Sequence, residues 1–82
     1  PDMEFQVLLT SVADVKDFVD AAAACPSEID VLSGRYVVNG KSIMCMFSID
    51  LSVPVKIVVH GDGAAEHAFR EKVERFAAAA DR

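Results

Sequence analysis

The sequence predicts an α+β domain built as an open-faced, two-layer sandwich, with a four-stranded antiparallel sheet and three helices on one face. Three observations lead to this class. The chain has 82 residues, which is enough for a single hydrophobic core. Apolar side chains recur every second residue in short segments and at helical spacing in two longer segments. A two-residue turn signal joins two of the short segments, which favours antiparallel pairing.

The first strand is predicted over residues 3–10, where apolar and polar side chains alternate. Ser11 then offers a hydroxyl that can cap a helix, and Asp14 supplies the acidic half of a capping box. Pro26 ends the predicted helix, because the residue before a proline is pushed out of the helical region. The apolar stripe of this helix consists of Val12, Val15, Phe18, Val19 and Ala22.

A β-hairpin and a short helix follow. Residues 28–32 and 35–39 are β-prone, and Ser33-Gly34 between them is a turn signal. After a second turn at Asn39-Gly40, apolar residues at helical spacing predict a short helix that starts after Ser42. These apolar residues are Ile43, Met44, Phe47 and Leu51.

The last two elements are a strand over residues 53–60 and a second long helix. Pro54 fits only at the start of this strand or on an edge. The turn Gly61-Asp62-Gly63 ends it. The helix has an apolar stripe of Ala65, Phe69, Val73, Phe76 and Ala80. In the predicted two-layer fold, the residues expected to be buried together are Phe18, Val19, Phe69, Val73 and Phe76.

Composition and charge exclude several functional classes. The net charge is −5, with eight basic residues dispersed among thirteen acidic ones, so a nucleic-acid-binding surface is not expected. The longest apolar runs, at residues 21–25 and 77–80, are far shorter than the ~20 residues that cross a bilayer. We therefore expect a cytoplasmic protein with no membrane segment.

The domain is expected over residues 3–82, with Pro1 and Asp2 left over from expression.

The residue types that mark enzymes, metal sites and cofactor sites are not grouped in this sequence. There is no Ser/His/Asp grouping, no glycine-rich phosphate loop and no metal-spaced set of carboxylates. Cys25 and Cys45 are twenty residues apart without a CxxC pattern, so both are interpreted as reduced, buried thiols. We expect no catalytic residue, no metal and no cofactor.

With these elements in place, the chain resembles the HPr family, the small phosphocarrier proteins of the bacterial sugar phosphotransferase system (PTS) and their regulatory relatives. The resemblance covers the whole domain and implies an open-faced sandwich of four antiparallel strands and three helices. It is densest at Phe18-Val19, at Ser27-Glu28-Ile29, at the Ser33-Gly34 hairpin and at Gly40-Lys41-Ser42-Ile43-Met44.

The phosphoacceptor of the family is missing from this sequence. In the phosphocarriers, a histidine at the start of the first helix accepts phosphate, and an arginine follows two residues later. Counting back without gaps from Phe18-Val19 puts Ser11 at the histidine position and Ala13 at the arginine position. A serine phosphate ester is too stable to be passed on, and Asp14 would repel an incoming anion. Ser11 is interpreted as a helix cap, with a role as acceptor as the alternative.

The chain's two histidines do not replace the missing acceptor. His60 ends the fourth predicted strand, and His67 lies in the first turns of the last helix. Both are interpreted as solvated surface histidines.

Ser42 is the family site that this sequence retains. The resemblance implies that a dedicated ATP-dependent kinase phosphorylates this serine and that the product binds a transcriptional regulator. Lys41 adds a nearby cation, and the resemblance implies an exposed, partner-binding patch of Ile43, Met44 and Phe47. Two structural alternatives stay open: Ser42 caps the short helix, and the three apolar residues pack in the core.

These observations predict an HPr-like regulatory or protein-binding module that acts through the Ser42 face and is not a phosphocarrier. The expected partners are proteins: an HPr-type kinase, a transcriptional regulator or a PTS component. The alternative is a working phosphocarrier of the sugar phosphotransferase system with a displaced acceptor.

Overall fold

One antiparallel sheet forms the first layer of the fold, and helices form the second. The computed structural model of the chain describes residues 1–78. The strands are β1 (Met3–Val7), β2 (Ile29–Ser33), β3 (Tyr36–Asn39) and β4 (Val55–Val59), in the spatial order β1-β4-β2-β3. The helices are α1 (Val12–Ala23), α2 (Ile43–Met46) and α3 (Ala64–Lys72), and a 3-10 helix, η1 (Glu74–Phe76), follows α3.

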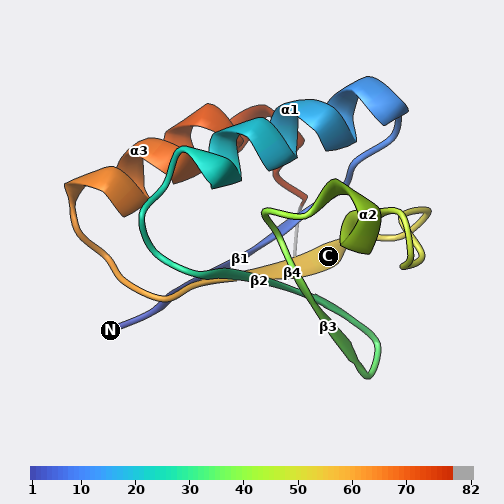
Figure 1. Ribbon diagram of the computed structural model, residues 1–82, viewed down its shortest axis with the longest axis horizontal. Coiled ribbons are helices and arrows are strands. Elements are labelled where there is room, and N and C mark those ends of the chain that lie inside the picture. Colours follow the sequence, from blue (N-terminus) through green and yellow to red (C-terminus); the bar gives the residue numbers. More distant parts are fainter. Residues whose placement is uncertain (79–82) are drawn as a thin grey trace.

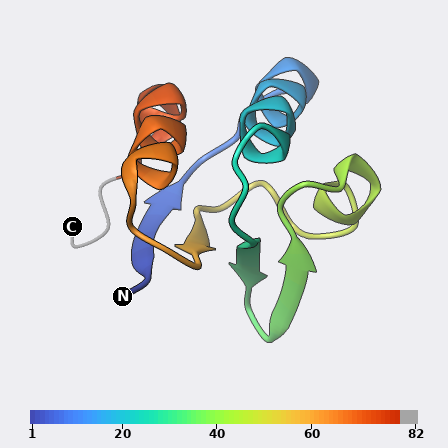
Figure 2. The same cartoon turned by 60° about the vertical axis from the view of Figure 1, so that its left-hand side comes forward.

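Helices α1 and α3 lie side by side over one face of the sheet, and α2 lies beside α1, next to β3 (Figure 1, Figure 2). The central strand β4 shows why only one face is covered. Its residues Val55, Ile57 and Val59 are buried beneath the helices. Lys56 points to the other face, where its ammonium is 2.9 Å from the Glu4 carboxylate. The structure is thus the predicted α+β, open-faced sandwich, and the fold class is confirmed.

The core lies between the sheet and the two long helices. All five residues expected to be buried together are buried in one cluster: Phe18, Val19, Phe69, Val73 and Phe76. The Phe69 ring is at its centre, 5.7 Å from the Phe18 ring in an edge-on arrangement and 6.3 Å from the Phe5 ring. The helical period therefore predicted these five residues correctly. Val12 and Ala65, which belong to the same predicted stripes, are exposed.

The last helix is shorter than its apolar stripe predicted. Helix α3 ends at Lys72, and η1 turns the chain back toward the edge strand β1. There the Leu8 N–H donates to the Phe76 carbonyl at 2.9 Å, and the Ala78 N–H donates to the Gln6 carbonyl at 2.9 Å. These bonds satisfy backbone groups of the edge strand, which a continuing helix could not do. Ala80 and the expected domain end at residue 82 lie outside the described residues.

The hairpin turn is displaced by one residue from its prediction. Ser33 pairs with Tyr36, so the two turn residues are Gly34 and Arg35 instead of Ser33 and Gly34. Gly34 has a φ of 60°, the positive value that a type II′ turn requires at its first position. The fourth strand starts at Val55, directly after Pro54, which accords with the expected place of that proline.

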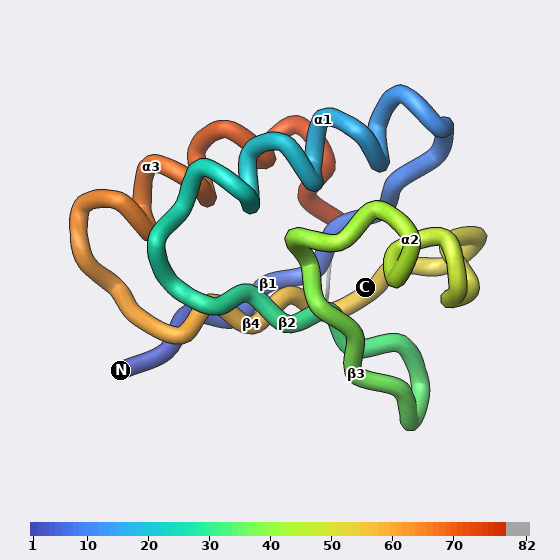
Figure 3. The backbone as a smooth tube through the Cα atoms, viewed as in Figure 1, coloured from blue at the N-terminus to red at the C-terminus, as the bar shows by residue number. Residues whose placement is uncertain are grey.

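Glu66 is a buried acidic residue that the sequence did not reveal. Its side chain lies in the first turn of α3, and its Oε2 accepts a hydrogen bond from the Ser27 hydroxyl in the α1–β2 connection. This bond is the main cause that lowers the pKa of the Glu66 carboxyl. Figure 3 shows that the α1–β2 and β4–α3 connections meet at the same end of the domain. The bond between Ser27 and Glu66 therefore joins the end of α1 to the start of α3.

No helix within residues 1–78 has the length and the apolar character needed to span a membrane.

Candidate functional site

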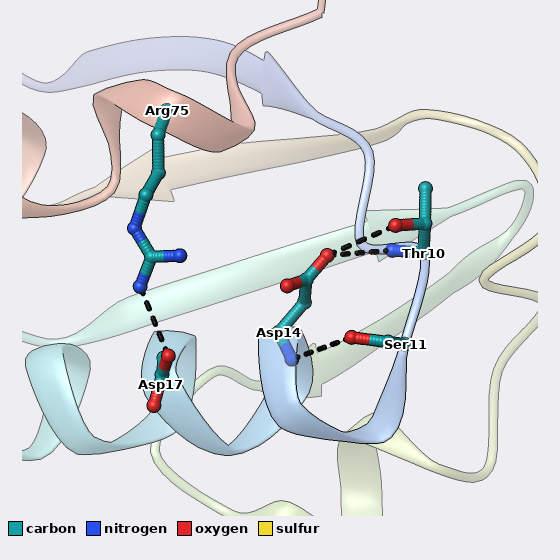
Figure 4. A network of polar contacts seen from close by, with 5 residues as sticks. All are labelled: Thr10, Ser11, Asp14, Asp17 and Arg75. Carbon is teal, nitrogen blue, oxygen red and sulfur yellow. Dashed lines mark hydrogen bonds and ion pairs between the residues drawn. The ribbon is translucent and has the colours of Figure 1, made fainter.

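At the start of α1, where the resemblance places the phosphoacceptor of a carrier, the side chains make hydrogen bonds within their own segment (Figure 4). Ser11 is the N-cap, and its Oγ accepts a hydrogen bond from the Asp14 N–H at 3.0 Å. The Asp14 carboxylate in turn accepts from the Thr10 N–H at 3.1 Å and from the Thr10 hydroxyl at 3.0 Å. The backbone bond from Thr10 is the main cause that lowers the pKa of Asp14. A carboxylate thus occupies the helix start, and the predicted capping role of Ser11 is confirmed.

The arginine drawn in Figure 4, Arg75, is paired with a carboxylate of α1. Arg75 reaches from η1 toward α1, and its Nη2 is 3.0 Å from an Asp17 carboxylate oxygen. Its guanidinium also lies over the Phe76 ring, 4.2 Å from the ring centroid. At the position where the resemblance expects an arginine, Ala13 has only an exposed methyl group. The arrangement at the start of α1 therefore offers a carboxylate and two hydroxyls.

Both histidines lie at the other end of the domain. Strand β1 pairs with β4 so that Met3 faces Val59, which places His60 beside the first residue of β1, whereas Ser11 follows the last. The His60 ring contacts two carboxylates, with Nδ1 3.1 Å from Asp2 and Nε2 2.8 Å from Asp30. His67 is exposed on α3. The described structure therefore places no imidazole at the start of α1.

We predict that His60 titrates above its ordinary pKa of 6.5, chiefly because of its hydrogen bond to Asp30. Because folding raises the pKa of His60, its contacts with the two carboxylates stabilise the folded protein most strongly below pH 6.5. This contribution to the free energy of unfolding is lost as the pH rises through the pKa of the folded state. The measurement is an NMR titration of the His60 ring protons. Asp30→Asn should move the midpoint back toward 6.5, and an unchanged midpoint would show that Asp30 does not act on His60.

Ser42 caps helix α2, as the sequence predicted. Its Oγ accepts a hydrogen bond from the Cys45 N–H at 3.2 Å, and its carbonyl accepts from the Met46 N–H at 3.0 Å. The Ser42 N–H donates to the Asn39 carbonyl at 3.1 Å, which fixes the connection from β3. Ser42 is half-buried, so it lies at the boundary between the domain and solvent.

Three apolar side chains of α2 and its C-cap project into solvent. Met44 is 82% exposed, Phe47 48% and Ile43 37%, and we call these three residues the α2 patch. Met46 is the one residue of this four-residue helix that is fully buried in the core. A single helical turn can direct only part of its side chains inward, so the others remain exposed.

A groove of about 420 Å³ extends from the α2 patch to the start of α1. Its lining is formed by Leu8, Leu9, Thr10, Ser11, Val15, Phe47, Leu51 and Ser52. These residues are apolar or carry hydroxyls, and none is charged. Phe47 belongs both to the groove and to the α2 patch, so the two form a continuous surface. The sequence did not predict this groove, because its walls come from three separate segments.

Lys41 does not direct its charge toward the Ser42 hydroxyl. Its Nζ donates a hydrogen bond to the Cys25 carbonyl at 2.6 Å, at the C-terminal end of α1. Cys25 is buried and Cys45 is half-buried, and both are free thiols. Among residues 1–78, no cluster of three or more histidine, cysteine or acidic side chains could hold a metal ion.

Comparisons with known proteins agree with the fold. A family model described as "PTS HPr component phosphorylation site" matches residues 14–79. The matched span includes Ser42 and begins three residues after Ser11. A comparison with curated proteins gives no match. Because the match covers well over half of the chain, the protein belongs to the HPr family of the phosphotransferase system.

Proposed function

We propose that this HPr-family protein is a regulatory or protein-binding module that acts through the Ser42 face and does not carry phosphate. The observation that carries the proposal is the start of α1, where Ser11 caps the helix and Asp14 occupies it with a carboxylate. The chemistry of Ser11 and Asp14 at the start of α1 supports the absence of a carrier role. The position of Ser42 beside the α2 patch supports a regulatory role.

A phosphocarrier needs a nucleophile that both accepts and releases phosphate near neutral pH. An imidazole nitrogen does so, whereas a serine ester holds its phosphate too firmly for onward transfer. The free N–H groups of a helix start can bind phosphate, but here the Ser11 hydroxyl already accepts from the Asp14 N–H. The Asp14 carboxylate adds repulsion against a phosphoryl group.

A displaced acceptor is the alternative mechanism for a carrier. His60 is a poor candidate, because both of its ring nitrogens face carboxylates. Those carboxylates favour the protonated ring, which lacks the free lone pair that attacks phosphorus, and they repel the phosphoryl donor. The contacts of His60 therefore favour the binding module over a carrier.

The α2 side of the face suits regulation by partner proteins. Ser42 lies in the span that matches the phosphorylation-site family, and the α2 patch beside it is apolar and exposed. A phosphate on Ser42 adds charge at the edge of an apolar surface and so changes which protein can bind there. We propose a cytoplasmic protein without catalytic activity of its own. Its partners are an HPr-type kinase and a protein that binds the α2 patch, either a transcriptional regulator or a PTS component.

The test is phosphorylation by an HPr-type kinase with ATP, followed by mass spectrometry. We expect a single phosphate on the wild type and none on Ser42→Ala. Ser11→Ala, which removes the other helix-capping serine, should be modified like the wild type. Ser42→Ala loses a cap worth about 1 kcal/mol, so Ser42→Asn, which keeps a capping oxygen, is included to separate misfolding from loss of the acceptor.

An authentic HPr must be phosphorylated in the same reaction. Phosphate at another residue, or none while the authentic HPr is modified, would leave Ser42 with only its role as a cap. Partner binding at the α2 patch would then not be controlled by phosphorylation of Ser42.

A further inference from the structure

Lys41 connects two parts of the chain that are sixteen residues apart in sequence. Its ammonium donates to the Cys25 carbonyl at 2.6 Å, just after the end of α1. Its own N–H donates to the Asn39 side-chain oxygen at 2.9 Å, so the backbone at this position is held as well. The residue is half-buried and directly precedes Ser42.

The last turn of α1 contains no basic residue that could interact with the negative end of the helix. The C-terminal end of a helix carries partial negative charge, because its last carbonyls have no partner within the helix. Lys41 supplies the missing cation from the connection between β3 and α2. It therefore stabilises the end of α1 from a different part of the fold.

We propose that Lys41 couples Ser42 to the end of α1: a negative charge on residue 42 draws the ammonium away from the Cys25 carbonyl. This inference rests on the proposed role of Ser42. A phosphate dianion on the neighbouring residue attracts an ammonium more strongly than a neutral carbonyl does. Without its cation, the last turn of α1 opens more often. Lys41 therefore acts as a positioning residue: it holds the Cys25 carbonyl and, through it, the end of α1.

The segment that Lys41 holds is also the connection that reaches α3. Ser27, two residues after Cys25, donates its hydroxyl hydrogen bond to Glu66 in the first turn of α3. The Cys25 N–H donates to the Ala22 carbonyl at 3.0 Å, and the Ala24 N–H donates to the Asp20 carbonyl at 3.3 Å. These two amides report directly on the last turn of α1. Their exchange with solvent measures how often it opens.

The test compares Ser42→Asp with Ser42→Asn by NMR-detected amide hydrogen exchange. Both side chains cap a helix, and only aspartate adds a charge. We expect the Ala24 and Cys25 amides to exchange about two- to fivefold faster in Ser42→Asp, the factor expected for the loss of one charge at a helix end. Equal exchange in the two variants would overturn the coupling.

The role of Lys41 is tested in the same experiment. Lys41→Met should speed the exchange of both amides by itself and remove any further effect of Ser42→Asp, whereas Lys41→Arg should keep the slow exchange. If Ser42→Asp acts equally in the Lys41→Met background, the signal does not pass through Lys41. These measurements need no kinase, so they fail or succeed independently of Ser42 phosphorylation.

Discussion

Replacing Phe69 by alanine is expected to lower the free energy of unfolding by about 3–5 kcal/mol. The side chain is 2% exposed and packs between the rings of Phe5 and Phe18, at the point where both long helices meet the sheet. Its removal leaves a cavity and separates the other two aromatic rings. A small domain is typically stable by only about 5–15 kcal/mol, so this substitution removes a large share of the free energy of unfolding.

Phe47→Ala is the matched control, since the chemical change is the same on a half-exposed side chain. We expect it to cost about 1 kcal/mol or less. The measurement is urea denaturation followed by circular dichroism. The free energies of unfolding are compared with the same m-value, the slope of the free energy against urea concentration, for both variants. Equal losses in the two variants would mean that Phe69 is not the centre of the core. If the proposed function is correct, Phe47→Ala should also weaken binding of the proposed partner to the α2 patch while the protein stays folded.

Incubation with phosphoenolpyruvate and the general phosphotransfer enzyme of the PTS is expected to leave the protein unmodified. The reason is that Ser11 and Ala13 stand where the resemblance expects the acceptor histidine and its arginine, and that the Asp14 carboxylate occupies the helix start. The measurement is detection of acid-labile phosphate, with an authentic HPr as the positive control.

The double variant Ser11→His/Ala13→Arg shows whether the phosphotransfer enzyme still recognises the rest of the surface. It restores the two side chains that the resemblance identifies as missing. Acid-labile phosphate on this variant alone would locate the loss of carrier function at these two positions. If instead the unaltered protein carries acid-labile phosphate on His60 or His67, the displaced-acceptor mechanism is correct and the protein is a carrier.

The sequence was sufficient for the fold class because most local patterns agree with the tertiary packing in this chain. Each element pairs a regular apolar period with a boundary signal, such as Ser11 before α1 or Pro26 after it. Both capping serines, Ser11 and Ser42, were predicted correctly, because a cap acts on N–H groups two or three residues away. The same local reasoning failed for the last helix, whose end depends on hydrogen bonds to the edge strand β1.

The sequence alone determined the class of fold, the five residues of the shared core and the two serines that cap α1 and α2. Only the tertiary structure decided which distant residues meet. It placed the Lys41 ammonium on the Cys25 carbonyl and Ser27 against Glu66, and it joined Phe47 to the segment before α1 in one groove. The physical reason is range: helical period and capping act within a few residues, so they are visible in the sequence. Contacts between connections depend on how the strands are ordered in the sheet, which brings together the ends of elements that no local pattern relates.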